Sequence, residues 1–115
     1  MGYRSDVALA MTTDAAILMK ALCDHDPDLK RLIDDADEKY NWEEGDGVGE
    51  YTTKLMWSNI KWYDGYHEVD CITQFMNWVS EEDWYFIRIG EETDDTVQSG
   101  GFWDSDMYVS RTICL

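Results

Sequence analysis

Two pairs of residues carry side chains that commonly bind zinc. His67 and Cys71 are four positions apart and share one face of a predicted helix, while Cys23 and His25 lie close together at the end of an earlier helix. All four would meet if the two helices packed side by side. Cys-x-His is not a usual zinc-binding pattern, however, and burial in the core explains Cys71 equally well. We therefore predict no metal ion and no cofactor, with a metal held by these four residues as the alternative.

Three aspartates at alternate positions, Asp24, Asp26 and Asp28, mimic the start of a calcium-binding loop. Pro27 and Leu29 stand where such a loop needs a free amide and a glycine, which argues against calcium. Proline is favoured at the first position of a helix, and an aspartate before it commonly caps that helix. The pattern therefore predicts Asp26 as the N-cap of a short helix.

The sequence contains no motif that is typical of catalysis. It has no nucleophile motif and no phosphate-binding loop, and Gly45-x-Gly47-x-Gly49 lacks the strand and helix that flank a dinucleotide-binding fingerprint. His25 and His67 have acidic neighbours, as most residues of so acidic a chain do. We predict that the protein is not an enzyme and has no catalytic residues.

The most unusual property of the chain is its charge. It has 25 acidic residues and 9 Lys or Arg, which gives a formal net charge of -16. Nucleic acids and anionic membranes would be repelled by this charge, so we expect neither as a direct partner and favour a basic partner or none. Solubility alone requires a net charge of only about 2–8.

The carboxylates are concentrated in residues 24–50, 81–83 and 91–106. One interpretation is a solvated acidic surface without a partner. The other is a surface that mimics DNA, which carries one charge per ~1.7 Å of axis, and that occupies the basic groove of a nucleic-acid-binding protein. Neighbouring carboxylates would best approach this density, and we predict as partner-binding residues Asp34, Asp35, Glu43, Glu44, Glu91, Glu92, Asp94 and Asp95.

Length and composition predict one folded domain over residues 1–115. Hydrophobic residues make up 44% and aromatic residues 14% of the chain, which distinguishes it from disordered acidic chains. Three widely spaced cysteines predict reduced thiols, not a disulfide framework. The sequence shows neither a signal peptide nor a membrane span, so we expect a cytoplasmic protein.

The first third of the chain predicts a strand and two helices. Tyr3–Met11 alternates as a strand, with Val7, Leu9 and Met11 on one face and, on the other, alanines that would let a helix lie close. Thr12 and Thr13 cap a helix that ends near Cys23. Its apolar stripe is expected to contain Ile17, Leu18, Ala21 and Leu22. The second helix, from Asp28 to about Asp37, would pack through Leu29, Leu32, Ile33 and Ala36.

The stretch Lys54–Tyr63 is predicted to be the strand around which the chain is organised, paired with a short strand at Lys39–Trp42. Both of its faces carry large apolar side chains, as in an interior strand. Alternation places on one face Met56, Ile60 and Trp62, and on the other Leu55, Trp57 and Tyr63.

The remaining chain predicts a helix at His67–Glu82 and strands at Trp84–Gly90 and Met107–Cys114, separated by a polar loop at 91–105. The helix stripe would contain Val69, Ile72, Met76 and Val79, widened by Phe75 and Trp78. In the last strand, Met107, Val109 and Ile113 should face inward, together with Arg111. The order β-α-α-β-β-α-β-β indicates an α+β fold with helices packed on one face of a mainly antiparallel sheet, close to a ferredoxin-like plan.

The chain has more aromatic residues than we expect the core to bury. We expect that Trp42, Trp57, Trp103 and Tyr51 are not all buried. An exposed aromatic ring among carboxylates is a common anchor in protein interfaces, while a sheet face partly covered by loops is the alternative.

Two segments, MGYRSDVALA at the start and FIRIGEETDD from Phe86 to Asp95, resemble small uncharacterised acidic proteins encoded by bacteriophages. This resemblance covers about a sixth of the chain and implies a phage product that acts in the bacterial cytoplasm. Such proteins are similar in kind to anti-CRISPR and anti-restriction inhibitors, some of which mimic DNA. Those DNA mimics are mostly helical, whereas this chain is predicted to be mixed.

Charge and resemblance together predict a phage-encoded inhibitor of a host defence system. It would bind a basic, nucleic-acid-binding surface, for example of a CRISPR effector, through an acidic, DNA-mimicking face and without turnover. The alternatives are a small α+β module that holds a small ligand or metal, and a phage accessory protein without inhibitory role.

Overall fold

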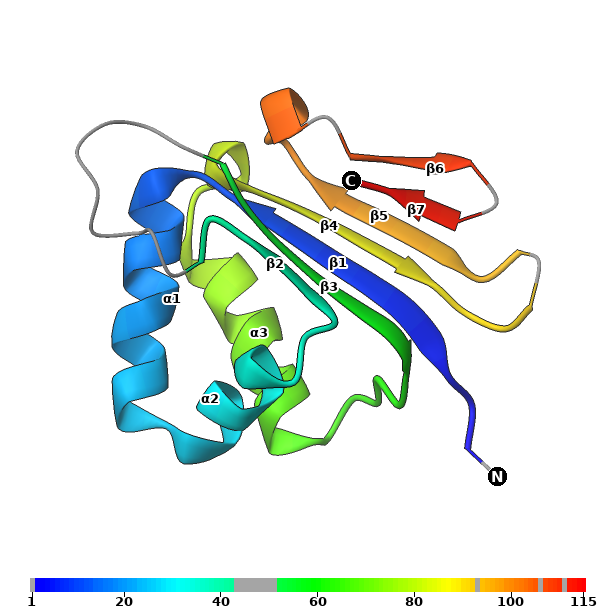
Figure 1. Ribbon diagram of the computed structural model, residues 1–115, viewed down its shortest axis with the longest axis horizontal. Helices are drawn as coiled ribbons and strands as arrows, with labels where there is room; N and C mark the ends of the chain where they lie inside the picture. The colour runs from blue at the N-terminus through cyan, green and yellow to red at the C-terminus, as the bar shows by residue number, and fades with distance from the viewer. Residues whose placement is uncertain (1, 43–51, 93, 106, 111) are drawn as a thin grey trace.

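The computed structural model describes residues 2–42, 52–92, 94–105, 107–110 and 112–115 (Figure 1). The main sheet has five strands, in the order β2-β3-β1-β4-β5, and every neighbouring pair is antiparallel. Its strands are β1 (Ser5–Met11), β2 (Glu38–Tyr40), β3 (Thr53–Ile60), β4 (Trp84–Ile89) and β5 (Thr96–Gly100). The helices are α1 (Thr13–His25), α2 (Pro27–Asp34) and α3 (His67–Trp78), and a small second sheet is formed by β6 (Tyr108–Ser110) and β7 (Thr112–Cys114).

The arrangement confirms the predicted α+β fold. The three helices lie on one face of the sheet (Figure 1). Up to β4, the succession of strands and helices is that of a ferredoxin-like plan in which α2 is an additional helix, and β5 then extends the sheet beyond β4. In the described part of the chain, no strand pairs with the outer side of β5.

The central strand is β1, not the predicted Lys54–Tyr63. β1 pairs along its length with β3 on one side and with β4 on the other. β3 is an interior strand, as predicted, but its outer neighbour β2 is only three residues long. The sheet is therefore organised around the first strand of the chain.

The two faces of β1 pack against different layers. Val7, Leu9 and Met11 belong to the large core beneath the helices. Ala8 and Ala10 belong to a smaller core that contains Met107 and Ile113 of the C-terminal segment. The prediction that the alanine face would receive a helix is therefore wrong, because the face is covered by the β6–β7 segment.

Helix α1 has a different buried stripe from the predicted one. Its buried residues are Ala15, Ala16, Met19 and Cys23. By contrast, Ile17, Leu18 and Ala21 are exposed and Leu22 is only partly buried. Only Thr12 separates β1 from α1, and its amide donates to the carbonyl oxygen of Asp83 (2.9 Å) while its hydroxyl caps the helix. This short, anchored connection fixes the rotation of the helix, so tertiary packing overrides the most apolar stripe.

Helix α2 agrees with the prediction in its cap and its packing. Asp26 is its N-cap and accepts hydrogen bonds from the amides of Asp28 and Leu29. Its predicted packing residues Leu29, Leu32, Ile33 and Ala36 are all buried. The helix ends at Asp34, three residues before the predicted end.

Helix α3 is shorter than predicted. Val69, Ile72 and Phe75 are buried, and Met76 and Val79 pack against the core, as expected. Trp78 is the last helical residue and is 71% exposed, contrary to prediction. Residues Glu81–Asp83 form a separate 3-10 turn capped by the Ser80 side chain, so these acids do not oppose the dipole of α3.

Alternation in β3 fails near its end. Leu55 and Trp57 face the helices and Met56 faces the other layer, as predicted, but Ile60 and Trp62 also pack on the helix side. Asn59 has a left-handed backbone (φ 57), and the β1–β3 register shifts between Ser5 and Val7. Such a bulge changes the face to which the following side chains point, so placing Ile60 and Trp62 beside Met56 was wrong.

The C-terminal part contains two features that the sequence pattern did not reveal. The predicted loop 91–105 includes β5, which pairs with β4, and the predicted strand Met107–Cys114 is two short paired strands, β6 and β7. Met107 and Ile113 are buried and Val109 is partly buried, as expected. Arg111 lies outside the described residues.

Candidate functional site

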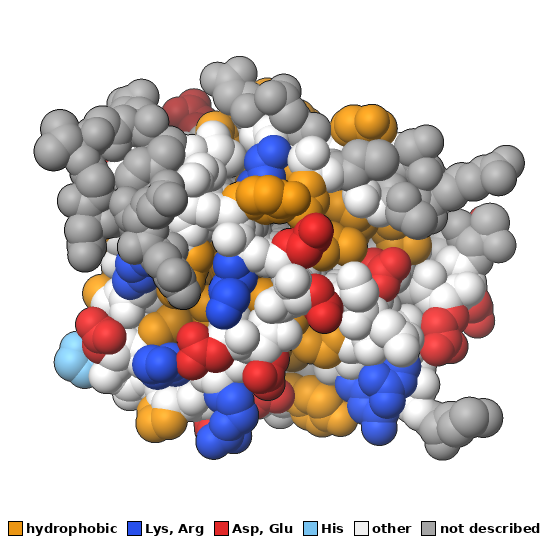
Figure 2. All heavy atoms as spheres, in the orientation of Figure 1, with side chains coloured by type: hydrophobic (Ala, Val, Ile, Leu, Met, Phe, Trp, Pro, Cys, Tyr) orange, Lys and Arg blue, Asp and Glu red, His pale blue; other side chains and the backbone are white. Residues whose placement is uncertain are grey.

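The structure brings four of the predicted partner-binding residues together at the turn between β4 and β5. Glu91, Glu92 and Asp94 are exposed there, and Asp95 is partly buried. Acidic side chains are visible at the right-hand edge of the molecule in Figure 2, on the side where Figure 1 places this turn.

Asp95 serves as the internal brace of this turn. Its carboxylate accepts hydrogen bonds from the two terminal nitrogens of Arg88 (2.7 and 3.1 Å) and from the Tyr3 hydroxyl (2.6 Å). Arg88, and then Tyr3, hold the pKa of Asp95 below its usual value. Conversely, the hydrogen bond to Asp95 raises the pKa of the Tyr3 hydroxyl. A bidentate Arg–carboxylate pair is rigid as well as strong.

Backbone amides also form hydrogen bonds that hold this turn next to Asp95 and Tyr3. The amide of Gly90 donates to the carbonyl oxygen of Asp95 (2.7 Å), and the amide of Glu92 donates to the Tyr3 hydroxyl (3.1 Å). A Cβ atom at Gly90 would collide with the Asp95 carboxylate and the Tyr3 hydroxyl. The three exposed carboxylates are therefore presented on a fixed support.

The other predicted acids are placed elsewhere. Asp34 and Asp35 lie at the end of α2, and Figure 1 shows α2 among the helices, away from the β4–β5 turn. The Asp34 carboxylate forms an ion pair with Lys30 (2.9 Å), which offsets its charge. Glu43 and Glu44 lie outside the described residues. On the face seen in Figure 2, acidic and basic side chains are interspersed.

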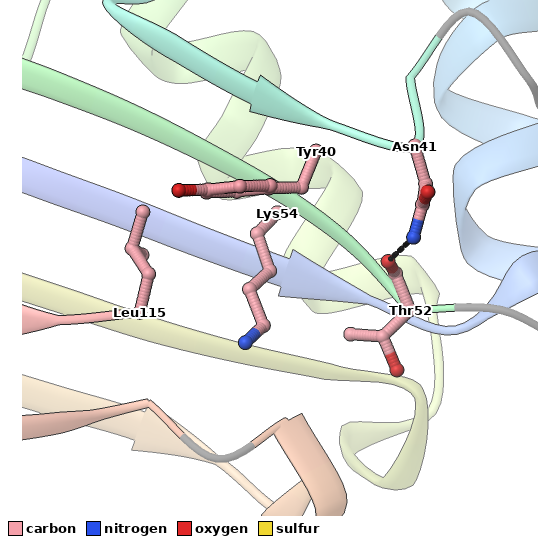
Figure 3. Close-up of a pocket in the computed structure, with 5 residues that line it drawn as sticks. All are labelled: Tyr40, Asn41, Thr52, Lys54 and Leu115. Atoms are coloured by element: carbon pink, nitrogen blue, oxygen red, sulfur yellow. Dashed lines mark hydrogen bonds between the residues drawn. The ribbon is translucent and has the colours of Figure 1, made fainter.

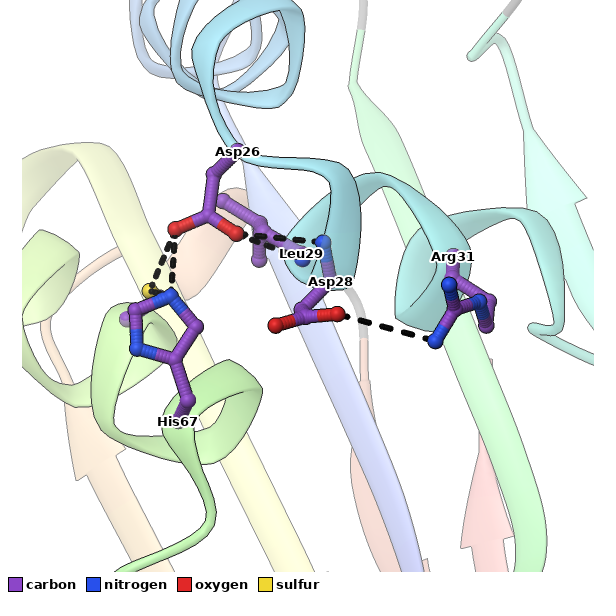
Figure 4. A network of polar contacts seen from close by, with 6 residues as sticks. Asp26, Asp28, Leu29, Arg31 and His67 are labelled. Atoms are coloured by element: carbon purple, nitrogen blue, oxygen red, sulfur yellow. Dashed lines mark hydrogen bonds and ion pairs between the residues drawn. The ribbon is translucent and has the colours of Figure 1, made fainter.

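A second cluster joins the α1–α2 corner to the start of α3 (Figure 4). The Asp26 Oδ2 atom lies 2.6 Å from His67 Nε2 and 3.3 Å from Cys71 Sγ, and the sulfur is 3.6 Å from the same ring nitrogen. The other oxygen of Asp26 is used to cap α2. Oxygen, nitrogen and sulfur atoms from three residues therefore converge in one place.

The electrostatics of this cluster follow from its contacts. Hydrogen bonds from the Leu29 amide and from His67 lower the pKa of Asp26, and Asp26 in turn raises the pKa of His67. Burial, and then the hydrogen bond to Asp26, raise the pKa of the Cys71 thiol to about 11. Cys71 is therefore a neutral thiol at pH 7 and a weak nucleophile.

The cluster differs from the predicted four-ligand arrangement. His67 and Cys71 meet as the helical spacing predicts, but Cys23 and His25 are not members of the cluster. Cys23 is buried, and burial raises its pKa to about 11, whereas His25 is exposed. The third member, Asp26, was identified from the sequence only as a helix cap. Its position between two helices depends on packing that a local pattern does not contain.

The cluster does not have the geometry of a Cys-His-Asp catalytic triad. In such a triad the two ring nitrogens contact different partners, with one facing the nucleophile and the other the carboxylate. Here Nε2 faces both Asp26 and Cys71. The contacts therefore differ from those of such a triad.

A shallow pocket of about 320 Å³ lies beside β2 and β3 (Figure 3). It is lined by Tyr40, Asn41, Thr52, Lys54 and Leu115, and the Asn41 side-chain amide donates to the carbonyl oxygen of Thr52 (2.8 Å). Among the described residues that line it, only Lys54 has a charged side chain. These described residues therefore offer no converging acidic and basic side chains, and we assign the pocket no chemistry.

The aromatic residues divide into buried and exposed ones, as expected. Trp57 is 1% exposed and its indole donates to the carbonyl oxygen of Leu32 (2.8 Å). Trp42 packs against the helix-side core with Lys20 over its ring, whereas Trp103 is 73% exposed. Tyr51 lies outside the described residues. Of the four, Trp103 alone among those described is available as an interface anchor.

Comparisons with protein-family models, curated proteins and solved structures find no match to this chain. Across the described residues, no helix combines the length and apolarity needed to cross a bilayer.

Proposed function

We propose that the protein is a phage-encoded inhibitor that binds a basic, nucleic-acid-binding surface of a host defence complex. A CRISPR effector or a restriction enzyme in the host cytoplasm is the expected kind of target. The inhibitor acts by occupying the surface that DNA or RNA would use, without turnover.

The observation that carries this proposal is the braced acidic turn between β4 and β5. Its exposed residues Glu91, Glu92 and Asp94 flank a carboxylate, Asp95, that Arg88 already holds, and the Glu91 carboxylate also accepts a hydrogen bond from the Arg4 amide (3.1 Å). Preorganised charge lowers the cost of binding. Figure 1 shows the ends of β4 and β5 that flank these residues at one end of the sheet, and Glu91, Glu92 and Asp94 are exposed there.

The charge of the whole chain supports the same function. Among the described residues, only Asp26, Asp28, Asp34 and Asp95 form ion pairs with a basic side chain. Most of the excess negative charge is therefore not neutralised within the molecule. A field of this kind accelerates association with a basic partner and is weakened by salt.

The test measures whether the protein displaces a labelled DNA duplex from purified CRISPR effectors and restriction enzymes. We expect displacement at low salt that weakens steeply as salt is raised. Replacing Glu91, Glu92 and Asp94 by Lys should abolish it. A control with the same change in net charge, Lys at the exposed residues Asp64, Glu81 and Glu82, should retain most of it. Equal losses in the two variants, or no displacement from any target, would contradict the proposal.

A further inference from the structure

Asp26, His67 and Cys71 form a second candidate site that the proposed function does not use. The three residues come from two places in the chain, the cap of α2 and the first turns of α3. They offer one carboxylate oxygen, one imidazole nitrogen and one sulfur, all within 4.8 Å of one another. We propose that these three side chains bind a zinc ion.

The distances in the cluster are close to those of a zinc site. Ligands at about 2.0–2.3 Å from zinc in a tetrahedron lie roughly 3.3–3.8 Å from one another. The observed S···N separation is 3.6 Å and the S···O separation is 3.3 Å. Only the N···O separation of 2.6 Å is shorter, as expected of a hydrogen-bonded pair. The His67 side chain is 61% exposed, so it can move outward to admit the ion.

The two carboxylate oxygens of Asp26 have different partners, as suits a metal ligand. One oxygen, Oδ1, accepts both capping hydrogen bonds, while the contacts of Oδ2 among the described residues are with His67 and Cys71. The capping bonds fix the carboxylate in place, as hydrogen bonds behind a ligand do in metal sites. A cation could therefore bind Oδ2 without undoing the start of α2.

The chemistry of the donors and their surroundings selects the ion. A thiolate and an imidazole favour zinc over magnesium or calcium, which prefer oxygen. Asp28 and Glu68 act electrostatically on His67, and Asp70 on Cys71, so the surroundings are negative. On binding, the Cys71 thiol loses its proton to solvent and His67 binds through neutral Nε2.

Three protein ligands leave the fourth position of a tetrahedral zinc open. Structural zinc sites usually have four protein ligands, and sites that hold a water or an exogenous ligand have three. The exposure of His67 places the open position within reach of solvent. The site would thus bind a water, or a donor atom from another molecule, in addition to joining α2 to α3.

The test is a zinc titration of the full-length protein after treatment with a chelator, in a buffer with a reductant that does not bind metal. We expect one zinc ion per chain. Cys71→Ser and His67→Asn should each weaken binding at least ~100-fold, because even changes behind a ligand often weaken it by about 10–100-fold. His25→Asn is the matched control, since His25 is an exposed histidine next to Asp26 that is not in the cluster, and it should bind as the wild type does.

A spectroscopic measurement separates a specific site from general attraction to an acidic surface. Cobalt(II) in place of zinc should give a tetrahedral spectrum with a thiolate-to-metal band, which Cys71→Ser removes. Circular dichroism without metal checks that each variant is folded. Absence of zinc binding, several weak equivalent ions, or equal weakening by His25→Asn would overturn the proposal. It does not rest on the proposed inhibitor function, so either can fail alone.

Discussion

The Asp95 carboxylate shows how one residue can serve the fold within a charged turn. It receives three hydrogen bonds from Arg88 and Tyr3, whereas the carboxylate of neighbouring Asp94 is exposed. The two residues carry the same charge and lie side by side in the sequence. They therefore form a matched pair for separating structural from electrostatic effects.

Asp95→Asn should lower the melting temperature by several degrees, because the amide cannot accept both Arg88 hydrogen bonds as a charged group does. Asp94→Asn should leave it nearly unchanged or slightly raise it, since it removes one negative charge from a strongly acidic molecule. Thermal melts followed by circular dichroism at pH 7 measure both. A larger loss in Asp94→Asn than in Asp95→Asn would contradict the role of the brace.

The lowered pKa of Asp95 also predicts how stability changes with pH. The pKa of Asp95 is lowered in the folded protein from 3.8, so its contribution is present above that value and is lost as pH falls through the folded pKa. Urea unfolding between neutral pH and about pH 3 should therefore show a smaller acid-induced loss of stability in Asp95→Asn than in the wild type. The same acid-induced loss in both proteins would assign it to other carboxylates.

At the scale of elements, the rotation of α1 is set by the single residue between it and β1. This rotation buries Met19 completely and leaves Ile17 52% exposed. Met19→Ala should cost about 2–5 kcal/mol as a large-to-small change in the core. Ile17→Ala should change the free energy of unfolding by less than ~0.5 kcal/mol, as is usual for surface positions. Urea titrations distinguish the two, and the reverse order would mean that α1 presents its other face to the sheet.

The attachment of α2 to the sheet depends on Trp57. Its buried indole donates to the carbonyl oxygen of Leu32, in the last turn of α2. Trp57→Phe removes this donor and leaves a buried acceptor without its partner, which should cost about 1–3 kcal/mol. Trp78→Phe, at a ring that is 71% exposed, is the control and should be close to neutral. Similar losses in both variants would contradict the role assigned to the buried Trp57 indole.

Sequence patterns predicted the elements best where local chemistry alone determines them. The cap of α2 at Asp26, the position of β4 and the buried residues Val69 and Ile72 follow from local sequence patterns and capping, and all agree with the structure. β5 contains a single apolar side chain, Val97, and most of its residues are exposed, so the strand carries no apolar alternation and was missed. The bulge at Asn59 was missed because a left-handed residue depends on the neighbouring strand.

The candidate sites were predictable to the same extent. Spacing placed His67 and Cys71 on one helix face, and neighbouring acids marked the β4–β5 turn. Spacing did not reveal that Asp26 reaches α3, or that Asp95 turns inward to Arg88. Both facts depend on contacts between residues distant in sequence, which only the folded chain defines.

At the scale of the whole molecule, a formal charge of -16 is carried by a chain whose radius of gyration is 13.4 Å. Such self-repulsion destabilises a compact state and is weakened by salt. The melting temperature should therefore rise as NaCl is increased from about 0.01 to about 0.15 M, over which the screening length falls from ~30 to ~8 Å. In a variant with Asn at Asp64 and Gln at Glu81 and Glu82 the rise should be shallower. A melting temperature independent of salt would show that the charges are too well solvated to interact.

The outer side of β5 has a consequence for how the protein behaves in acid. An uncovered edge strand is a template on which another copy can add its own strand, and many proteins discourage this with charge. None of the described strands pairs with this edge, and we expect mutual repulsion between copies of so acidic a chain to protect it until that repulsion vanishes near the isoelectric point of about 4.1. Acidification should therefore expose the chain to edge-to-edge assembly into β-rich aggregates.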